Sequence, residues 1–82
     1  MELKVISPEG TNIYKISWLE LNTKIGNFIV QPGHTPMIVS LALDKEVVFC
    51  LENGVQEKFT PNTGIAEITR TSVRLLLNQM TS

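Results

Sequence analysis

The feature that most constrains the fold of this chain is the spacing of its apolar residues, which recur at every second position. The clearest examples are Met37, Val39, Leu41 and Leu43 and, further along, Val73, Leu75 and Leu77. Successive side chains of a β-strand point to opposite faces, so this spacing predicts strands with one buried face. A helix over residues 65–80, which contain no Gly or Pro, is the competing interpretation. The Ile, Thr and Val residues of that stretch argue against it, because β-branched side chains are restricted in helices.

Turn-forming residues separate the apolar runs at intervals of about 8 to 12 residues, which is typical of a sandwich or barrel. We expect turns at residues 7–10, 23–26, 44–45, 53–54, 61–64 and 70–71. Asn53 and Gly54 give the strongest hairpin signal, since both tolerate the positive φ of a type I′ turn. The expected strands are residues 3–6, 13–21, 28–31, 37–43, 46–52, 55–59, 65–69 and 72–78. About eight short strands predict an all-β domain.

Size and charge exclude several classes of protein. The 82 residues suffice for one domain with a single modest core. Seven basic and eight acidic residues give a net charge of -1, without the basic footprint of a nucleic-acid binder. No apolar run approaches the roughly 18 residues of a membrane helix, and residues 1–4 do not resemble a secretory leader. We therefore expect a soluble monomer in a reducing compartment.

The residue types needed for metal or nucleophilic chemistry are almost absent. Cys50 is the only cysteine and lies in the apolar run of residues 47–51, so we expect a small buried residue and no disulfide. His34 is the only histidine, and a zinc site needs several His or Cys ligands. A Cys–His dyad would require Cys50 to be exposed. We therefore expect no catalytic residue, no metal and no cofactor.

The segment PGHTP, residues 32–36, is the most distinctive local sequence. Pro32 and Pro36 fix two φ angles and remove two backbone donors, and Gly33 allows a turn that a side chain would hinder. A loop restrained in this way loses little entropy when it binds a partner. Two interpretations remain open at this point: a tight strand connection in which His34 hydrogen-bonds its own backbone, and a shaped surface for a partner.

Four segments resemble the epsilon subunit of F-type ATP synthases, which is called delta in mitochondria. GNFIVQPGHTPMIVSL, residues 26–41, resembles the family motif Gly-Glu-x-Gly-(Ile/Val)-x-Pro-Gly-His-Ala-Pro-Leu-Leu. LKVISPEG, TGIAEIT and SVRLLLN resemble further family segments in the same order. The resemblance extends over essentially the whole chain. It implies one domain, residues 1–82, folded as a flattened antiparallel β-sandwich of about eight to ten short strands.

The resemblance also implies a function. Members of the family are non-catalytic subunits of the central stalk, where they touch the gamma subunit and the ring of c subunits and help to transmit torque. The ATP synthase would translocate protons or sodium ions, and this chain would meet the membrane only through the complex. Its place would be the cytoplasmic face of a bacterial inner membrane or the organellar equivalent. The candidate interface residues are Ser7, Asn27, Phe28, Ile29, Pro32, Gly33, His34, Thr35 and Pro36.

The chain departs from the family motif at several positions. Asn27 stands where the family carries Glu, Ile29 replaces the second glycine, and Thr35 replaces alanine. The neutral Asn27 removes a charge that could pair with polar loops of the ring. The family's C-terminal helical hairpin would begin near Ser82, so we expect that hairpin, and inhibition through it, to be absent. A free-standing β-sandwich interaction module is the alternative function, and a small enzyme is the third.

Overall fold

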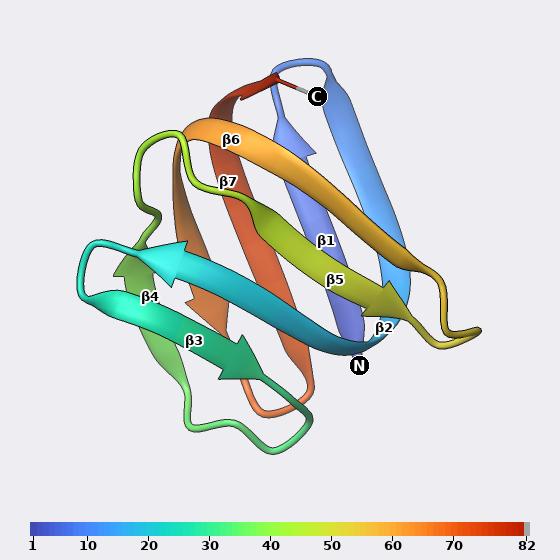
Figure 1. Ribbon diagram of the computed structural model, residues 1–82. Coiled ribbons are helices and arrows are strands. Elements are labelled where there is room, and N and C mark those ends of the chain that lie inside the picture. The colour runs from blue at the N-terminus through green and yellow to red at the C-terminus, as the bar shows by residue number, and fades with distance from the viewer. Residues whose placement is uncertain (82) are drawn as a thin grey trace.

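The computed structural model describes residues 1–81, with side chains described through Asn78, and forms seven strands and no helix within that range (Figure 1). The strands are β1 (Glu2–Ser7), β2 (Gly10–Thr23), β3 (Gly26–Val30), β4 (Met37–Ser40), β5 (Val47–Leu51), β6 (Gln56–Ile68) and β7 (Ser72–Thr81). The all-β prediction is confirmed. The competing helix over residues 65–80 is excluded, because that stretch forms the end of β6, a turn and β7.

The strands form two layers, and two long strands take part in both (Figure 1). Sheet A contains the first part of β2, then β1, β7, the second part of β6, and β4. Sheet B contains β3, the second part of β2, β5 and the first part of β6. All neighbouring strands are antiparallel except β1 and β7, which run parallel. The expected β-sandwich is therefore built largely, but not wholly, from antiparallel pairs.

The core lies between the two sheets and comes from the inward face of each strand. Its residues are Leu3, Val5, Ile16, Leu19, Leu21, Val30, Val39, Leu41, Val47, Phe49, Ala66, Ile68, Val73, Leu75 and Leu77. On β7, Val73, Leu75 and Leu77 are buried, whereas Leu76 between them is 39% exposed. This is the alternation that the spacing of apolar residues predicts.

Strand β5 is apolar on both faces, as its sequence predicts. Val47 and Phe49 belong to the core between the sheets. Cys50 follows Phe49 and therefore points to the opposite, outward face of sheet B, where it stands beside Trp18 in the register of β2 and β5. It is 8% exposed but does not belong to the core between the sheets. The expectation of a small buried cysteine is confirmed, and Cys50 is buried on the outward face of sheet B.

The turn expected at residues 61–64 is wrong. Strand β6 continues through this stretch as it passes from sheet B to sheet A, and its register with β7 shifts on both sides of Thr63. Pro61 has no backbone donor and Gly64 has no side chain, and both properties suit a bulged strand as well as a turn. The Pro-Gly signal thus marks a bend in a continuous strand.

Two further expectations need smaller corrections. Strand β4 ends at Ser40, so the predicted strand over residues 37–43 is too long, and Leu43 is 57% exposed in the turn before β5.

The hairpin between β5 and β6 is confirmed, but it is not a type I′ turn. Only Gly54 has a positive φ, of 93°, and its amide donates to the carbonyl of Leu51 at 2.9 Å. A type I turn followed by a glycine bulge fits this pattern.

Candidate interaction surface

The loop between β3 and β4, residues 31–36, begins with a defined turn. The amide of His34 donates to the carbonyl of Gln31 at 3.1 Å, which places Pro32 and Gly33 at the two central positions. Gly33 has a φ of 89°, and a positive φ at the second central position is the signature of a type II turn. The Pro-Gly pair is therefore required by the local backbone.

His34 is half-buried and uses one ring nitrogen within the loop. Its Nδ1 atom lies 2.7 Å from the carbonyl oxygen of Thr35. A carbonyl can only accept, so Nδ1 carries a proton and is the donor of this contact. The interpretation in which His34 hydrogen-bonds its own backbone is thus observed. No group of three or more metal-binding side chains occurs among the described residues.

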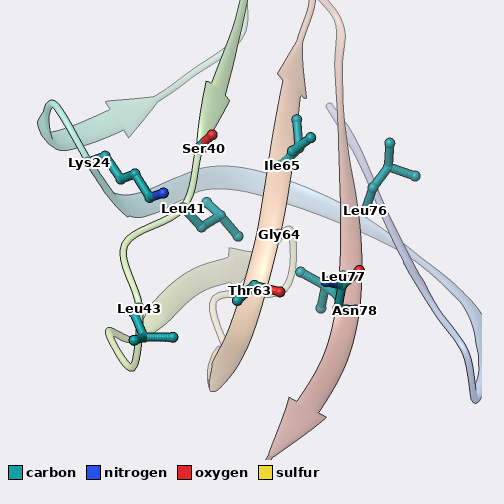
Figure 2. A pocket seen from close by; sticks show the side chains of 10 residues that line it. All are labelled: Lys24, Ser40, Leu41, Leu43, Thr63, Gly64, Ile65, Leu76, Leu77 and Asn78. Atoms are coloured by element: carbon teal, nitrogen blue, oxygen red, sulfur yellow. The ribbon is translucent and has the colours of Figure 1, made fainter.

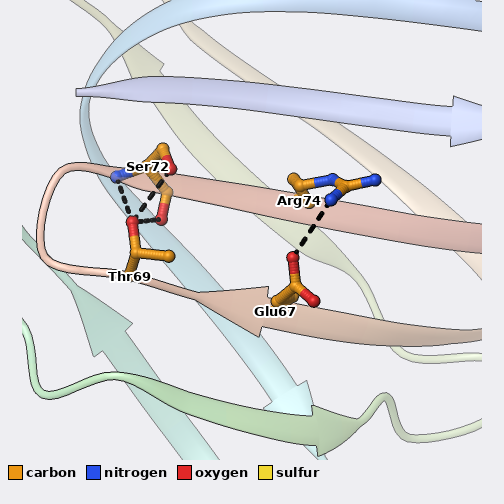
Figure 3. Close-up of polar contacts among 4 residues, drawn as sticks. All are labelled: Glu67, Thr69, Ser72 and Arg74. Atoms are coloured by element: carbon orange, nitrogen blue, oxygen red, sulfur yellow. Dashed lines mark hydrogen bonds and ion pairs between the residues drawn. The ribbon is translucent and has the colours of Figure 1, made fainter.

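A second loop, the turn between β6 and β7, is tied to the first. The amide of Gly33 donates to the carbonyl of Arg70 at 2.7 Å. In the turn itself, the hydroxyl of Thr69 lies 3.0 Å from the amide, 3.1 Å from the carbonyl and 2.9 Å from the hydroxyl of Ser72 (Figure 3). Residues 31–36 and 69–72 therefore form one braced surface, which we call the loop end.

Arg70 is the residue of the loop end that sequence reasoning missed. Its contact with Gly33 joins positions 37 residues apart. The local signal around Arg70 indicated only a turn, and the sequence offers no rule for which loop packs beside it. A strand order for the two sheets would have been needed to find it.

The candidate residues of β3 lie on the edge of sheet B, where Ile29 is close to the loop end and Asn27 is near the other end of the strand, opposite Asn22 of β2. Asn27 and Ile29 are exposed, whereas Phe28 is half-buried. The side-chain amide of Asn27 donates to Glu20 Oε2 and to Asn22 Oδ1, at 3.0 Å each. The donors of Asn27 are thus already engaged within sheet B, and Ile29 is the residue of this group that offers exposed apolar surface.

Ser7, the last residue of β1, is not brought together with residues 31–36. It closes the turn between β1 and β2, where its hydroxyl donates to the carbonyl of Gly10 at 3.4 Å. The loop end is at the other end of β1, where the amide of Glu2 donates to the carbonyl of Thr71. The length of β1 separates the two places by roughly 15–20 Å.

A hollow of about 540 Å³ lies on sheet A where β6 changes sheets (Figure 2). It is lined by Lys24, Ser40, Leu41, Leu43, Thr63, Gly64, Ile65, Leu76, Leu77 and Asn78. Lys24 is the only charged residue of this lining, which contains no carboxylate, imidazole or thiol. The hollow therefore has no pair of groups that could act as acid and base.

The comparison with known families decides what this sandwich is. The sequence-family model described as ATP synthase, delta/epsilon chain, β-sandwich domain, matches residues 1–82. The chain belongs to the ATP synthase delta/epsilon family. The family resemblance noted in the sequence is confirmed, and so is the expectation that the chain is non-catalytic, because members of the delta/epsilon family perform no chemistry.

Two solved structures contain a chain with a similar fold. A chain of the Euglena gracilis mitochondrial ATP synthase, solved as OSCP/F1/c-ring in rotational state 1, is similar with a TM-score of 0.84 and 15% identity. A chain of the Tetrahymena thermophila mitochondrial ATP synthase central stalk and c-ring is similar with a TM-score of 0.82 and 12% identity. At these identities the likeness establishes the fold.

The lengths of the two chains differ from that of the present one. The match covers 96% of this chain and 51% of the Euglena chain, and 100% of this chain and 66% of the Tetrahymena chain. No curated protein sequence matches the chain. Residues 1–81 contain no helix with the length and apolar character needed to cross a membrane.

Proposed function

We propose that this chain is a non-catalytic rotor subunit of an F-type ATP synthase that joins the gamma subunit to the c ring. Membership of the delta/epsilon family over residues 1–82 supports the placement in the complex. The observation that carries the contact is the 2.7 Å hydrogen bond from the amide of Gly33 to the carbonyl of Arg70. This bond makes two loops into one preformed surface.

A preformed surface suits a part that transmits torque. Pro32 and Gly33 set the type II turn, and the Thr69 hydroxyl holds the neighbouring turn, so little entropy remains to be lost on docking. The strands behind these loops belong to a packed two-sheet core, which moves as one body. Force applied at the loop end would therefore pass into the sandwich without first being absorbed by loop motion.

The proposed contact comprises the loop end and the adjoining Ile29 of β3. Pro32, Gly33, Thr35 and Pro36 contribute exposed surface, and His34 contributes its half-buried imidazole. Ser7 is left out because it lies at the other end of β1. In this role the chain would lie at the membrane surface, at the cytoplasmic face in a bacterium or the equivalent side in an organelle, and would carry neither the coupling ion nor a cofactor.

Replacing His34 by alanine is expected to weaken binding to a gamma subunit and to leave stability nearly unchanged. The backbone turn does not depend on the imidazole, whereas a central interface anchor is worth about 2 kcal/mol, or roughly thirtyfold in affinity. Isothermal titration of the chain with gamma measures the affinity, and thermal unfolding followed by circular dichroism measures the stability. Lys45→Ala, in the exposed turn before β5, is the matched control and should change neither quantity.

Two outcomes would contradict this proposal. If His34→Ala unfolds the domain while the surviving folded fraction binds gamma as before, His34 is a structural brace. If the unchanged, folded chain binds neither gamma nor the gamma–c-ring complex, the chain is a free-standing β-sandwich interaction module.

A further inference from the structure

Arg70 is a cation at the loop end that forms no ion pair among the described residues. Within the described residues, the ion pairs shorter than 4.0 Å join Lys58 to Glu46, Arg74 to Glu67, and the N-terminal ammonium to Glu52. Arg70 takes part in none of them. Within the part of the chain that the structure describes, its side chain makes one hydrogen bond, from Nη1 to the carbonyl of Gly33, at a long 3.5 Å.

The acid closest in sequence to Arg70 already pairs with another cation. Glu67 lies 3.3 Å from Arg74 on the outward face of sheet A (Figure 3). Glu2 lies beside the loop end, where its amide donates to the carbonyl of Thr71, but among the described residues its carboxylate forms no ion pair within 4.0 Å. Residues 31–36 and 69–72 contain no Asp or Glu. Residues 31–36 and 69–72 themselves therefore carry one positive charge, that of Arg70, although the whole chain has a net charge of -1.

The backbone around Arg70 holds the base of its side chain in place. The carbonyl of Arg70 accepts from Gly33, and the flanking Thr69 hydroxyl bonds to Ser72. The weak contact with Gly33 occupies one N–H of the guanidinium, and the side chain is exposed. The remaining N–H groups have the planar fork geometry that binds a carboxylate through two parallel hydrogen bonds.

We propose that the loop end docks an acidic polypeptide segment, with Arg70 binding a carboxylate of that segment. This inference rests on the proposed function, because the partner is a subunit of the stalk, and it adds the chemistry by which that partner is recognised.

The test compares charge reversals in the full chain. Arg70→Glu is expected to weaken binding to a gamma–c-ring complex by about tenfold or more at low salt, because a close charge pair becomes repulsive. Lys45→Glu, an equal change in net charge at an exposed turn away from the loop end, should stay within about twofold of the unchanged chain. Arg70→Lys should bind at an intermediate level, since it keeps the charge and loses the fork.

The salt dependence of binding distinguishes a charge–charge contact of Arg70 from a purely structural role, which would not depend on ionic strength in this way. Raising the ionic strength should weaken binding of the unchanged chain and should affect Arg70→Glu much less or in the opposite direction. Thermal unfolding should be the same for all variants, because Arg70 is exposed.

Each alternative outcome overturns the inference in a distinct way. Equal binding by Arg70→Glu and the unchanged chain refutes the role of Arg70 and leaves the proposed stalk function intact. Equal losses in Arg70→Glu and Lys45→Glu indicate a diffuse charge effect. If Arg70→Glu abolishes binding to phosphatidylglycerol vesicles but not to the stalk complex, Arg70 serves a lipid headgroup. Failure of the unchanged chain to bind the stalk complex refutes both the inference and the proposed function.

Discussion

Replacing Leu75 by alanine should lower the free energy of unfolding by about 2–5 kcal/mol. Leu75 is fully buried on β7 and lies between Val5 of β1 and Ala66 of β6 in the ladder of sheet A. A domain of 82 residues has a total stability of roughly 4–12 kcal/mol, so this single change removes a large share of it. Urea denaturation monitored by circular dichroism measures the loss.

The neighbouring Leu76 provides the matched control for Leu75. It has the same side chain on the same strand, but it points outward and is 39% exposed. Leu76→Ala should cost less than about 1 kcal/mol. A larger loss for Leu76 would mean that β7 is displaced by one residue, because such a shift exchanges the two faces of a strand. Equal losses would mean that the two faces of β7 are not buried to different extents.

Replacing Gly64 by alanine is expected to be the second large effect, at about 1–3 kcal/mol. A Cβ atom at this position would lie 2.7 Å from Leu77 Cδ2 and 2.8 Å from the carbonyl oxygen of Leu76. The leucine side chain can rotate away, but the carbonyl belongs to the paired strand β7 and moves only with it. The bulge where β6 changes sheets would have to open.

Thr63→Ala tests whether this cost is specific to Gly64. Thr63 is the preceding residue of β6 and its side chain is exposed, so its removal should change the stability by about 0.5 kcal/mol or less. A Gly64→Ala variant as stable as the unchanged chain would show that β6 and β7 do not approach each other closely at the bulge.

The strands and most turns of this domain could be predicted because they depend on local rules. Period-two spacing identified the buried face of β7, and short-range turn residues identified the hairpins at residues 7–10 and 53–54. Residues 61–64 were assigned wrongly because Pro and Gly report which backbone shapes are permitted. They do not report whether the chain reverses or bends and continues, and here pairing of β6 with β7 decides for the bend.

The candidate surface was only partly predictable, for a related reason. The loop of residues 31–36 could be found from its own prolines and glycine, whose geometry is local. Arg70 could not, because its place beside Gly33 follows from the order of strands in sheet A. The position of Ser7 relative to the loop was unpredictable for the same reason, since it depends on which end of β1 faces the loop.

The most direct test of the proposed stalk role is site-specific photo-crosslinking in the assembled complex. Single Thr35→Cys and Lys45→Cys variants, with the buried Cys50 replaced by alanine, would each carry a benzophenone on the exposed side chain. After assembly with a gamma–c-ring complex, illumination should crosslink position 35 to gamma or to a c subunit, with little product from position 45. Crosslinking from position 45 alone, or equally from both positions, would contradict the assignment of the loop end as the docking surface of this rotor subunit.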